Sequence, residues 1–157
     1  MLNVGIVGLG TIGKVVAKAL DDGIDGLQLN SIASARREKA EAFLATLSTP
    51  TEIMSIKEVA DCCEIVVDCA PKAVFAEIAN ATISRGKILV TVSGAGILAN
   101  PDIEKQAAEK KARVILATGA LLGLDAVRAA AEGTIKSVKM VTRKPPNALK
   151  GAPHIVE

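Results

Sequence analysis

A glycine-rich turn near the N-terminus constrains the fold of this chain more than any other feature of its sequence. Residues 8–13 read Gly-Leu-Gly-Thr-Ile-Gly, a G-x-G-x-x-G pattern. The apolar run 2–7 precedes this pattern, and from Ile12 onward apolar residues recur every three or four positions, as on one face of a helix. The sequence therefore predicts a strand, a tight turn and an amphipathic helix, which is the context that the pattern needs to bind a dinucleotide.

Each glycine of this turn has a physical role. Gly8 permits the tight turn, Gly10 allows the backbone to approach a pyrophosphate, and Gly13 lets the helix pack against the strand. The N–H groups at the start of the helix are free to bind phosphate. The predicted cofactor-binding residues of the turn are Gly8, Gly10, Thr11, Ile12 and Gly13. The alternative is a glycine-rich turn without a ligand.

Apolar β-branched runs alternate with helical patterns along the rest of the chain. We expect further strands over 27–33, 65–69, 87–92 and 114–117, with helices between them. This alternation is typical of a parallel sheet with helices on both faces. The predicted fold class is α/β, a doubly wound parallel sheet of the Rossmann type, which residues 1–133 would form as a dinucleotide-binding domain.

Three helix starts are marked in the sequence. Ser55 is expected to cap a short helix, with Glu58 as its partner in a capping box. Pro71 is expected in the first turn of another helix, and Asn100 with Pro101 is expected to begin the next one.

The end of the chain departs from this alternation. Residues 135–142 alternate as a final strand would, and Lys144-Pro145-Pro146 then breaks the pattern. We expect residues 134–157 to be the entry strand and tail of a second, mostly missing α+β domain; the alternative is an edge strand with a loose tail. An unpaired strand would pair with another copy or with a missing segment, so a homodimer is expected.

The residues after the second predicted strand bear on which dinucleotide binds. An acidic residue there would accept hydrogen bonds from a ribose 2′-hydroxyl, but the sequence reads Ser34-Ala35-Arg36-Arg37. Arginine supplies a charged fork for phosphate, and the serine hydroxyl can donate. We predict that Ser34, Arg36 and Arg37 bind a 2′-phosphate and that the cofactor is NADP, with NAD as the alternative. The other interpretation is that both arginines are simply solvated at a helix start, where cations oppose the dipole.

The loops after later strands should line the same crevice, because ligands of such sheets bind at the carboxyl ends of the strands. Small residues there suit a flat dinucleotide on backbone, and they suit a plain turn equally well. The predicted cofactor-binding residues of these loops are Cys69, Ala70, Pro71, Ser93 and Gly94. No residue is predicted to be catalytic, and Asp68 in its apolar strand is given no such role.

Composition argues against several classes of partner. Only Phe43 and Phe75 are aromatic, and 19 basic residues against 17 acidic ones leave a net charge of +2, so no nucleic-acid partner is expected. Apolar runs are shorter than the ~20 residues that span a membrane, and the N-terminus lacks the basic start of a secretory signal. We expect a cytoplasmic protein without a membrane partner.

The three cysteines are clustered at Cys62, Cys63 and Cys69, and the chain has one histidine. An odd, clustered set is not a disulfide framework, and one histidine makes zinc binding a poor interpretation. We therefore expect small apolar side chains near a strand and no metal site.

Several segments together resemble the L-aspartate dehydrogenase family. They are VGIVGLGTIG at the start, SGAG at 93–96, ATGALLGLDAV at 117–127 and TRKPPNAL at 142–149. The resemblance covers nearly the whole chain but only the N-terminal part of the family. It implies a two-domain enzyme that oxidises L-aspartate with NAD(P) to iminoaspartate, or aminates oxaloacetate with ammonia, and that can feed NAD biosynthesis.

The resemblance also assigns positions. Ala120 takes the place of a cofactor-contacting alanine, whereas His154, the single histidine, does not match the family's active-site motif. We therefore expect the dinucleotide-binding part of such an enzyme, inactive or nearly so alone. The alternatives are the cofactor domain of another dehydrogenase, of homoserine dehydrogenase or dihydrodipicolinate reductase type, and a stand-alone dinucleotide-binding or sensing module without catalysis.

Overall fold

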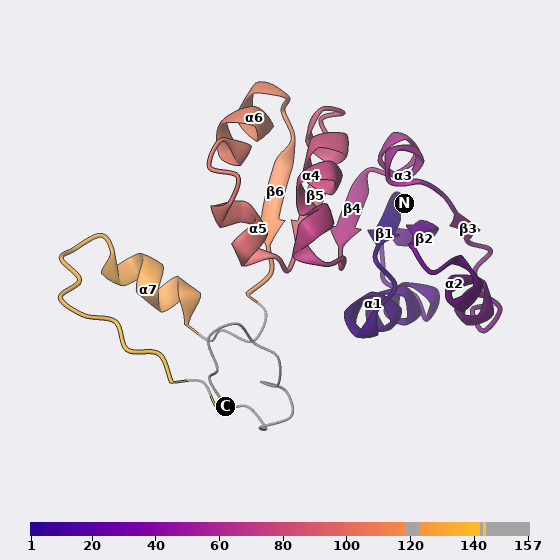
Figure 1. The fold of residues 1–157 in the computed structure, drawn as a ribbon, viewed down its shortest axis with the longest axis horizontal. Coiled ribbons are helices and arrows are strands. Elements are labelled where there is room, and N and C mark those ends of the chain that lie inside the picture. Colours follow the sequence, from indigo (N-terminus) through magenta and orange to yellow (C-terminus); the bar gives the residue numbers. More distant parts are fainter. Residues whose placement is uncertain (119–122, 142, 144–157) are drawn as a thin grey trace. The chain divides into compact units, whose positions relative to one another are not determined.

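Six parallel strands form one sheet in the order β3-β2-β1-β4-β5-β6 (Figure 1). They are β1 Leu2–Val7, β2 Leu27–Ala33, β3 Glu52–Ile53, β4 Ile65–Asp68, β5 Ile88–Thr91 and β6 Arg113–Leu116. Strands β2 and β3 are added in turn on one side of β1, and strands β4, β5 and β6 are added in turn on its other side. The predicted doubly wound α/β sheet is therefore confirmed, and its strand order reverses between β1 and β4.

The computed structural model describes residues 1–118, 123–141 and 143. The chain divides into two units, Met1–Ala120 and Leu121–Glu157. The first unit holds the sheet and the helices α1 Thr11–Asp21, α2 Arg37–Leu44, α3 Ile56–Cys62, η1 Lys72–Val74 (a 3₁₀ helix), α4 Phe75–Ile83, α5 Gly94–Leu98 and α6 Ile103–Glu109. The described part of the second unit holds α7 Leu124–Ala130.

Helices on the two faces of the sheet create two apolar cores. The core between the sheet and helices α1 and α2 includes Val4, Ile6, Ala17, Leu20, Leu29, Ile32 and Ala40. The core between the sheet and helices α3, α4 and α6 includes Val7, Val59, Val66, Phe75, Ile78, Leu89, Ile103 and Ala107. Because both faces of the central strands are covered, these strands need apolar side chains at nearly every position, which explains their continuous apolar runs.

Two short elements lie outside the predicted pattern. Strand β3 has two residues and helix α5 has five, so neither is long enough to show a period. The predicted start of a helix at Asn100 is wrong. The side-chain amide of Asn100 donates to the carbonyl of Gly96 at 2.8 Å and so closes α5, and Asp102 is the N-cap of α6.

The predicted strand over 135–142 is not formed in the part of the second unit that the structure describes. Residues 135–141 have no regular secondary structure there, and residue 142 lies outside the described residues. A strand needs a hydrogen-bonded neighbour, and none of the six described strands pairs with this segment. Val138, Met140 and Val141 are 67–69% exposed. The boundary between residues 133 and 134 stays a prediction.

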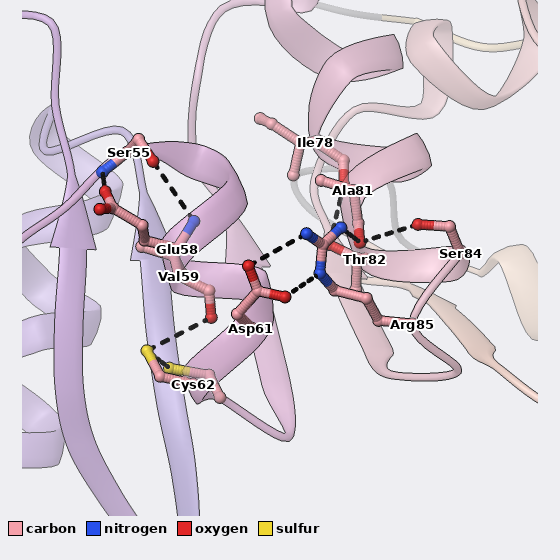
Figure 2. A network of polar contacts seen from close by, with 11 residues as sticks. Ser55, Glu58, Val59, Asp61, Cys62, Ile78, Ala81, Thr82, Ser84 and Arg85 are labelled. Carbon is pink, nitrogen blue, oxygen red and sulfur yellow. Dashed lines mark hydrogen bonds and ion pairs between the residues drawn. The ribbon is translucent and has the colours of Figure 1, made fainter.

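Helix α3 begins with the capping box that its sequence predicts (Figure 2). The N–H of Glu58 donates to Ser55 Oγ at 3.3 Å, and the N–H of Ser55 donates to Glu58 Oε2 at 2.8 Å. Hydrogen bonds that the side chain and the backbone of Ser55 make to the carboxylate of Glu58 hold the pKa of Glu58 below its usual range. Near the other end of α3, Asp61 pairs with Arg85, which also donates to the carbonyl of Ala81 (Figure 2). Helix α3 is thus capped at one end and tied to α4 at the other.

We expect Ser55→Ala to lower the free energy of unfolding by about 1 kcal/mol, because the hydroxyl that caps α3 is lost. Urea denaturation followed by circular dichroism measures this loss. Ser55→Thr keeps the hydroxyl and is the matched control, with an expected change of at most ~0.5 kcal/mol. Equal losses in the two variants would show that the hydroxyl does not stabilise the helix.

Candidate dinucleotide site

The turn between β1 and α1 lies where the order of the strands reverses. Gly8 has a φ of +95°, and a Cβ there would lie 2.6 Å from backbone atoms of Cys69 and Ala70. A Cβ on Gly13 would overlap the carbonyl oxygen of Gly8. Strand β1, helix α1 and the loop after β4 can therefore meet only because both positions lack a side chain.

Gly10 has a different environment. A Cβ built on Gly10 meets no atom within 4 Å, so its surroundings are open. Gly10 is the N-cap of α1, no side chain of the described residues caps this helix, and its first turn holds no acid. Thr11 and Ile12, which follow, are exposed. The first N–H groups of α1 are thus left for an anion, which fits the close approach of a phosphate.

Two cavities meet at Ser34, the residue after β2. One has a volume of about 420 Å³ and extends from Gly10 and Thr11 to α2; we call it the cationic cavity. The other has a volume of about 320 Å³ and extends from Gly8 to the loops after β3 and β4; we call it the apolar cavity. Ser34 lines both, so the two form neighbouring parts of one crevice along the ends of β1 and β2.

Three basic side chains line the cationic cavity, namely Lys14, Arg36 and Lys39, and no acidic residue lines it. The N–H of Arg36 donates to Ser34 Oγ at 3.3 Å, which leaves the Ser34 hydroxyl hydrogen for a ligand. The ammonium of Lys14 lies 5.3 Å from the centroid of the Phe43 ring. The sequence analysis missed Lys14 and Lys39. Lys39 lies three residues after Arg36, a spacing that places both on one side of α2, and this was the available signal. Lys14 comes from α1, and only the tertiary structure brings it to the same cavity.

Arg37 has a different environment from Arg36. Its Nε lies 2.9 Å from Oε1 of Glu41, one turn along α2, and both side chains are more than half exposed. Arg37 lines neither cavity. The structure thus brings Ser34 and Arg36 to the turn with Gly10, and it leaves Arg37 beside Glu41.

The loop after β4 contributes mainly backbone and small side chains. The N–H of Cys69 donates to the carbonyl of Val7 at 2.8 Å, while its side chain packs against the core beneath α1. Burial raises the pKa of the Cys69 thiol to about 11 and that of Cys63, in the other core, to about 12. Both cysteines therefore pack as predicted, and Ala70 and Pro71 line the apolar cavity.

A buried carboxylate joins the loops after β4 and β5. Asp68 is 1% exposed, and its Oδ1 accepts the N–H of Ala70 at 3.0 Å. Its Oδ2 accepts the hydroxyl of Thr91 at 2.7 Å, and Thr91 Oγ1 accepts the N–H of Ser93 at 2.9 Å. An acid within an apolar strand must find such partners, and this is the one signal in the sequence that points to the network.

Ser93 and Gly94, two further predicted residues that the structure describes, line neither cavity. Ser93 and Gly94 follow β5, where Ser93 Oγ accepts the N–H of Gly96 at 3.2 Å and caps α5. A Cβ on Gly94 would meet no atom within 4 Å. Ala120, which was predicted to contact the cofactor, lies outside the described residues, as does His154.

Two further observations concern only residues 1–118, 123–141 and 143. No three His, Cys, Asp or Glu side chains in this part of the chain are grouped so that they could hold a metal ion. None of the helices described there combines the length and the apolar character that crossing a membrane requires.

The different environments of Gly13 and Gly10 predict different losses of stability when each glycine is replaced by alanine. We expect Gly13→Ala to lower the free energy of unfolding by at least about 2 kcal/mol, because the new Cβ overlaps backbone that cannot rotate away. Gly10→Ala should cost no more than about 1 kcal/mol, since its Cβ enters open space. Urea denaturation of both variants measures the difference, and equal losses would contradict the assigned environments.

The carboxylate network predicts a coupling energy. Asp68→Asn removes an acceptor for the Thr91 hydroxyl, so we expect a loss of about 1–3 kcal/mol in the free energy of unfolding. Thr91→Val should also destabilise the protein, and the double variant should lose less than the two single losses together. Additive losses in this double-mutant cycle would mean that the two side chains act independently.

Comparison with known proteins adds two findings. The family model described as homoserine dehydrogenase, NAD binding domain, matches residues 8–117. L-aspartate dehydrogenase of Bradyrhizobium diazoefficiens is 48% identical over 155 residues, which are 99% of this chain and 55% of that protein. L-aspartate dehydrogenase 3 of Bordetella bronchiseptica is 40% identical over 157 residues, which are 99% of this chain and 58% of that protein. The chain thus spans little more than half the length of these relatives.

Solved structures are similar in fold. Scyllo-inositol dehydrogenase of Lactobacillus casei, with bound NAD(H) and scyllo-inositol, has a TM-score of 0.67 at 16% identity, over 84% of this chain and 41% of that one. Biliverdin reductase of Synechocystis sp. PCC 6803, in complex with biliverdin and NADP+, has a TM-score of 0.69 at 21% identity, over 83% of this chain and 43% of that one. At these identities the likeness concerns the fold alone.

Proposed function

Because this chain belongs to the family of the NAD-binding domain of homoserine dehydrogenase, we propose that it is the dinucleotide-binding part of an L-aspartate dehydrogenase. The observation that carries the choice of substrate is the 48% identity to a relative of that name over 155 residues. Two further relatives of that name, 40% and 36% identical, also match 99% of the chain. The aspartate chemistry is proposed for the chain together with the further length that these relatives have.

The residues of the crevice fit a dinucleotide. The open backbone at Gly10 and the N-terminus of α1 would hold the pyrophosphate, with Gly8 and Gly13 shaping the turn around it. Ser34 and Arg36 would hold the adenosine ribose and its 2′-substituent. We propose NADP(H) as the preferred cofactor and NAD(H) as the alternative, because the end of β2 offers a serine and a cation where an acid would accept from a 2′-hydroxyl.

The proposed reaction removes a hydride from the α-carbon of L-aspartate and a proton from its amino group, and the imine that forms hydrolyses to oxaloacetate and ammonia. When bound, the nicotinamide cofactor accepts the hydride. The described residues of this chain would bind and orient the cofactor. The turn would hold its phosphates, and the network of Asp68, Thr91 and Ser93 holds the loops after β4 and β5 in place. We propose that the acid–base group and the rest of the substrate pocket come from the further length of the relatives.

A second candidate function is a dinucleotide-binding or sensing module without catalysis. It is favoured by one observation: the glycine turn and both cavities belong to the unit Met1–Ala120. The division into domains 1–133 and 134–157, a homodimer, a cytoplasmic location and a role in NAD biosynthesis stay predictions within the first proposal.

Nucleotide titration tests the proposal directly. The chain has no Trp or Tyr, so the fluorescence of NADPH or NADH can be followed without a protein background. We expect saturable binding of NADPH, and we expect Gly10→Ala to weaken it at least about tenfold, or about 1.4 kcal/mol, because the new methyl group occupies the space for the pyrophosphate. Unfolding curves of the same variant serve as the control for folding.

Turnover separates the two candidate functions. The chain extended to the length of its relatives should reduce NADP+ when L-aspartate is added, and it should not do so with L-homoserine. A failure to bind either nucleotide would contradict both candidates. If the extended protein bound a nucleotide but showed no aspartate-dependent turnover, the proposed dehydrogenase activity would be rejected and the function of a binding module would be retained.

A further inference from the structure

We propose that Lys39, together with Arg36 and Lys14, forms a three-cation site that binds the 2′-phosphate of an adenosine nucleotide and selects NADP(H) over NAD(H). The inference rests on the proposed function, since it takes the nucleotide to lie along the glycine turn and Ser34. It also changes the prediction from the sequence, because it assigns the partner cation of Arg36 to Lys39 and not to Arg37.

The geometry of the cationic cavity carries the first step. Arg36 is the N-cap of α2 and Lys39 follows within the first turn, so both basic side chains belong to one end of one helix. Lys14 lies in the first turn of α1 and lines the same cavity. The N-termini of two helices and three cations therefore surround one space of about 420 Å³.

The three cations of this cavity form no ion pair within the described chain, although Glu38 lies in the same first turn of α2. The ion pairs there involve Lys18, Arg37 and Arg85, so none of the three cavity cations takes part in one. Cations at a helix N-terminus oppose the dipole, and like charges around one cavity repel each other. A dianionic phosphate would relieve both effects at once.

The position of the ammonium of Lys14 supports this assignment. It lies 5.3 Å from the centroid of the Phe43 ring, a contact that joins α1 to α2. This contact restrains a long, flexible side chain at the wall of the cavity before any ligand binds. Lys14 is therefore partly preorganised for an anion between the two helices.

The location relative to the turn indicates which phosphate the cations take. The pyrophosphate has the free N–H groups of α1 near Gly10, whereas Arg36 and Lys39 lie beyond Ser34, after the end of β2. In sheets of this order the end of the second strand reads the 2′-position of the adenosine ribose. Arg37 is a poorer partner, because its guanidinium is already bound to Glu41 at 2.9 Å.

A pair of small ligands isolates the proposed contact. Adenosine 2′,5′-bisphosphate differs from 5′-AMP only by the 2′-phosphate, and calorimetry measures both affinities. We expect Lys39→Ala to weaken binding of the bisphosphate about five- to tenfold, a moderate loss because an exposed charge is partly screened. The same variant should weaken binding of 5′-AMP less than about twofold. Lys39→Arg should restore most of the affinity. Lys105→Ala removes the same charge from an exposed position of α6 outside the cavity and should leave both affinities unchanged.

Each contrary result has a distinct meaning. Equal weakening of both ligands by Lys39→Ala would overturn the role of Lys39 in reading the 2′-phosphate. If Arg37→Ala selectively weakened binding of the bisphosphate and Lys39→Ala did not, Arg37 and not Lys39 would be the residue that binds the 2′-phosphate. A wild-type chain that binds NADH as tightly as NADPH would reject the three-cation site and keep the proposed dinucleotide function. Absence of binding by any of the four nucleotides would overturn both proposals.

Discussion

The close approach of three backbone segments at Gly8 and Gly13 is the constraint on which the rest of this structure depends. The carbonyl of Gly8 lies against Gly13 of α1, and the loop after β4 lies against Gly8. This contact sets α1 directly on β1 and places β4 beside it. The doubly wound order of the sheet, and the crevice at the reversal of that order, follow from this packing.

Polar groups at the carboxyl ends of the strands then give the crevice its form. Asp68 is one of the few buried polar residues, and its two oxygens join the ends of β4 and β5 through Ala70 and Thr91. Buried and satisfied hydrogen bonds of this kind fix loops more tightly than apolar contacts alone, because leaving any member unpaired is costly. The loops that follow β4 and β5 are thus held together by buried side chains.

The electrostatics of the crevice differ between its two parts. The cationic cavity collects Lys14, Arg36 and Lys39, whereas the apolar cavity is formed mostly by small and apolar residues after β1, β3 and β4. An adenosine nucleotide has the same division, with a flat base and charged phosphates. This agreement in chemistry supports the proposed binding of a dinucleotide.

The sequence by itself determined the parallel sheet, the glycine turn and the capping box of α3, because each depends on local periodicity, backbone freedom or residues three positions apart. Ser34 and Arg36, which lie within three residues of the end of β2, were predicted from the sequence, and both line the cationic cavity. The tertiary structure alone decided that Lys14 shares a cavity with Arg36 and Lys39, because the packing of the fold brings residues of α1 and α2 together. The three-residue spacing of Arg36 and Lys39 is local, and it places Arg37 on another side of α2, beside Glu41. The tertiary structure also decided the absence of a strand over residues 135–141, because a strand forms only where another strand lies beside it to accept its hydrogen bonds.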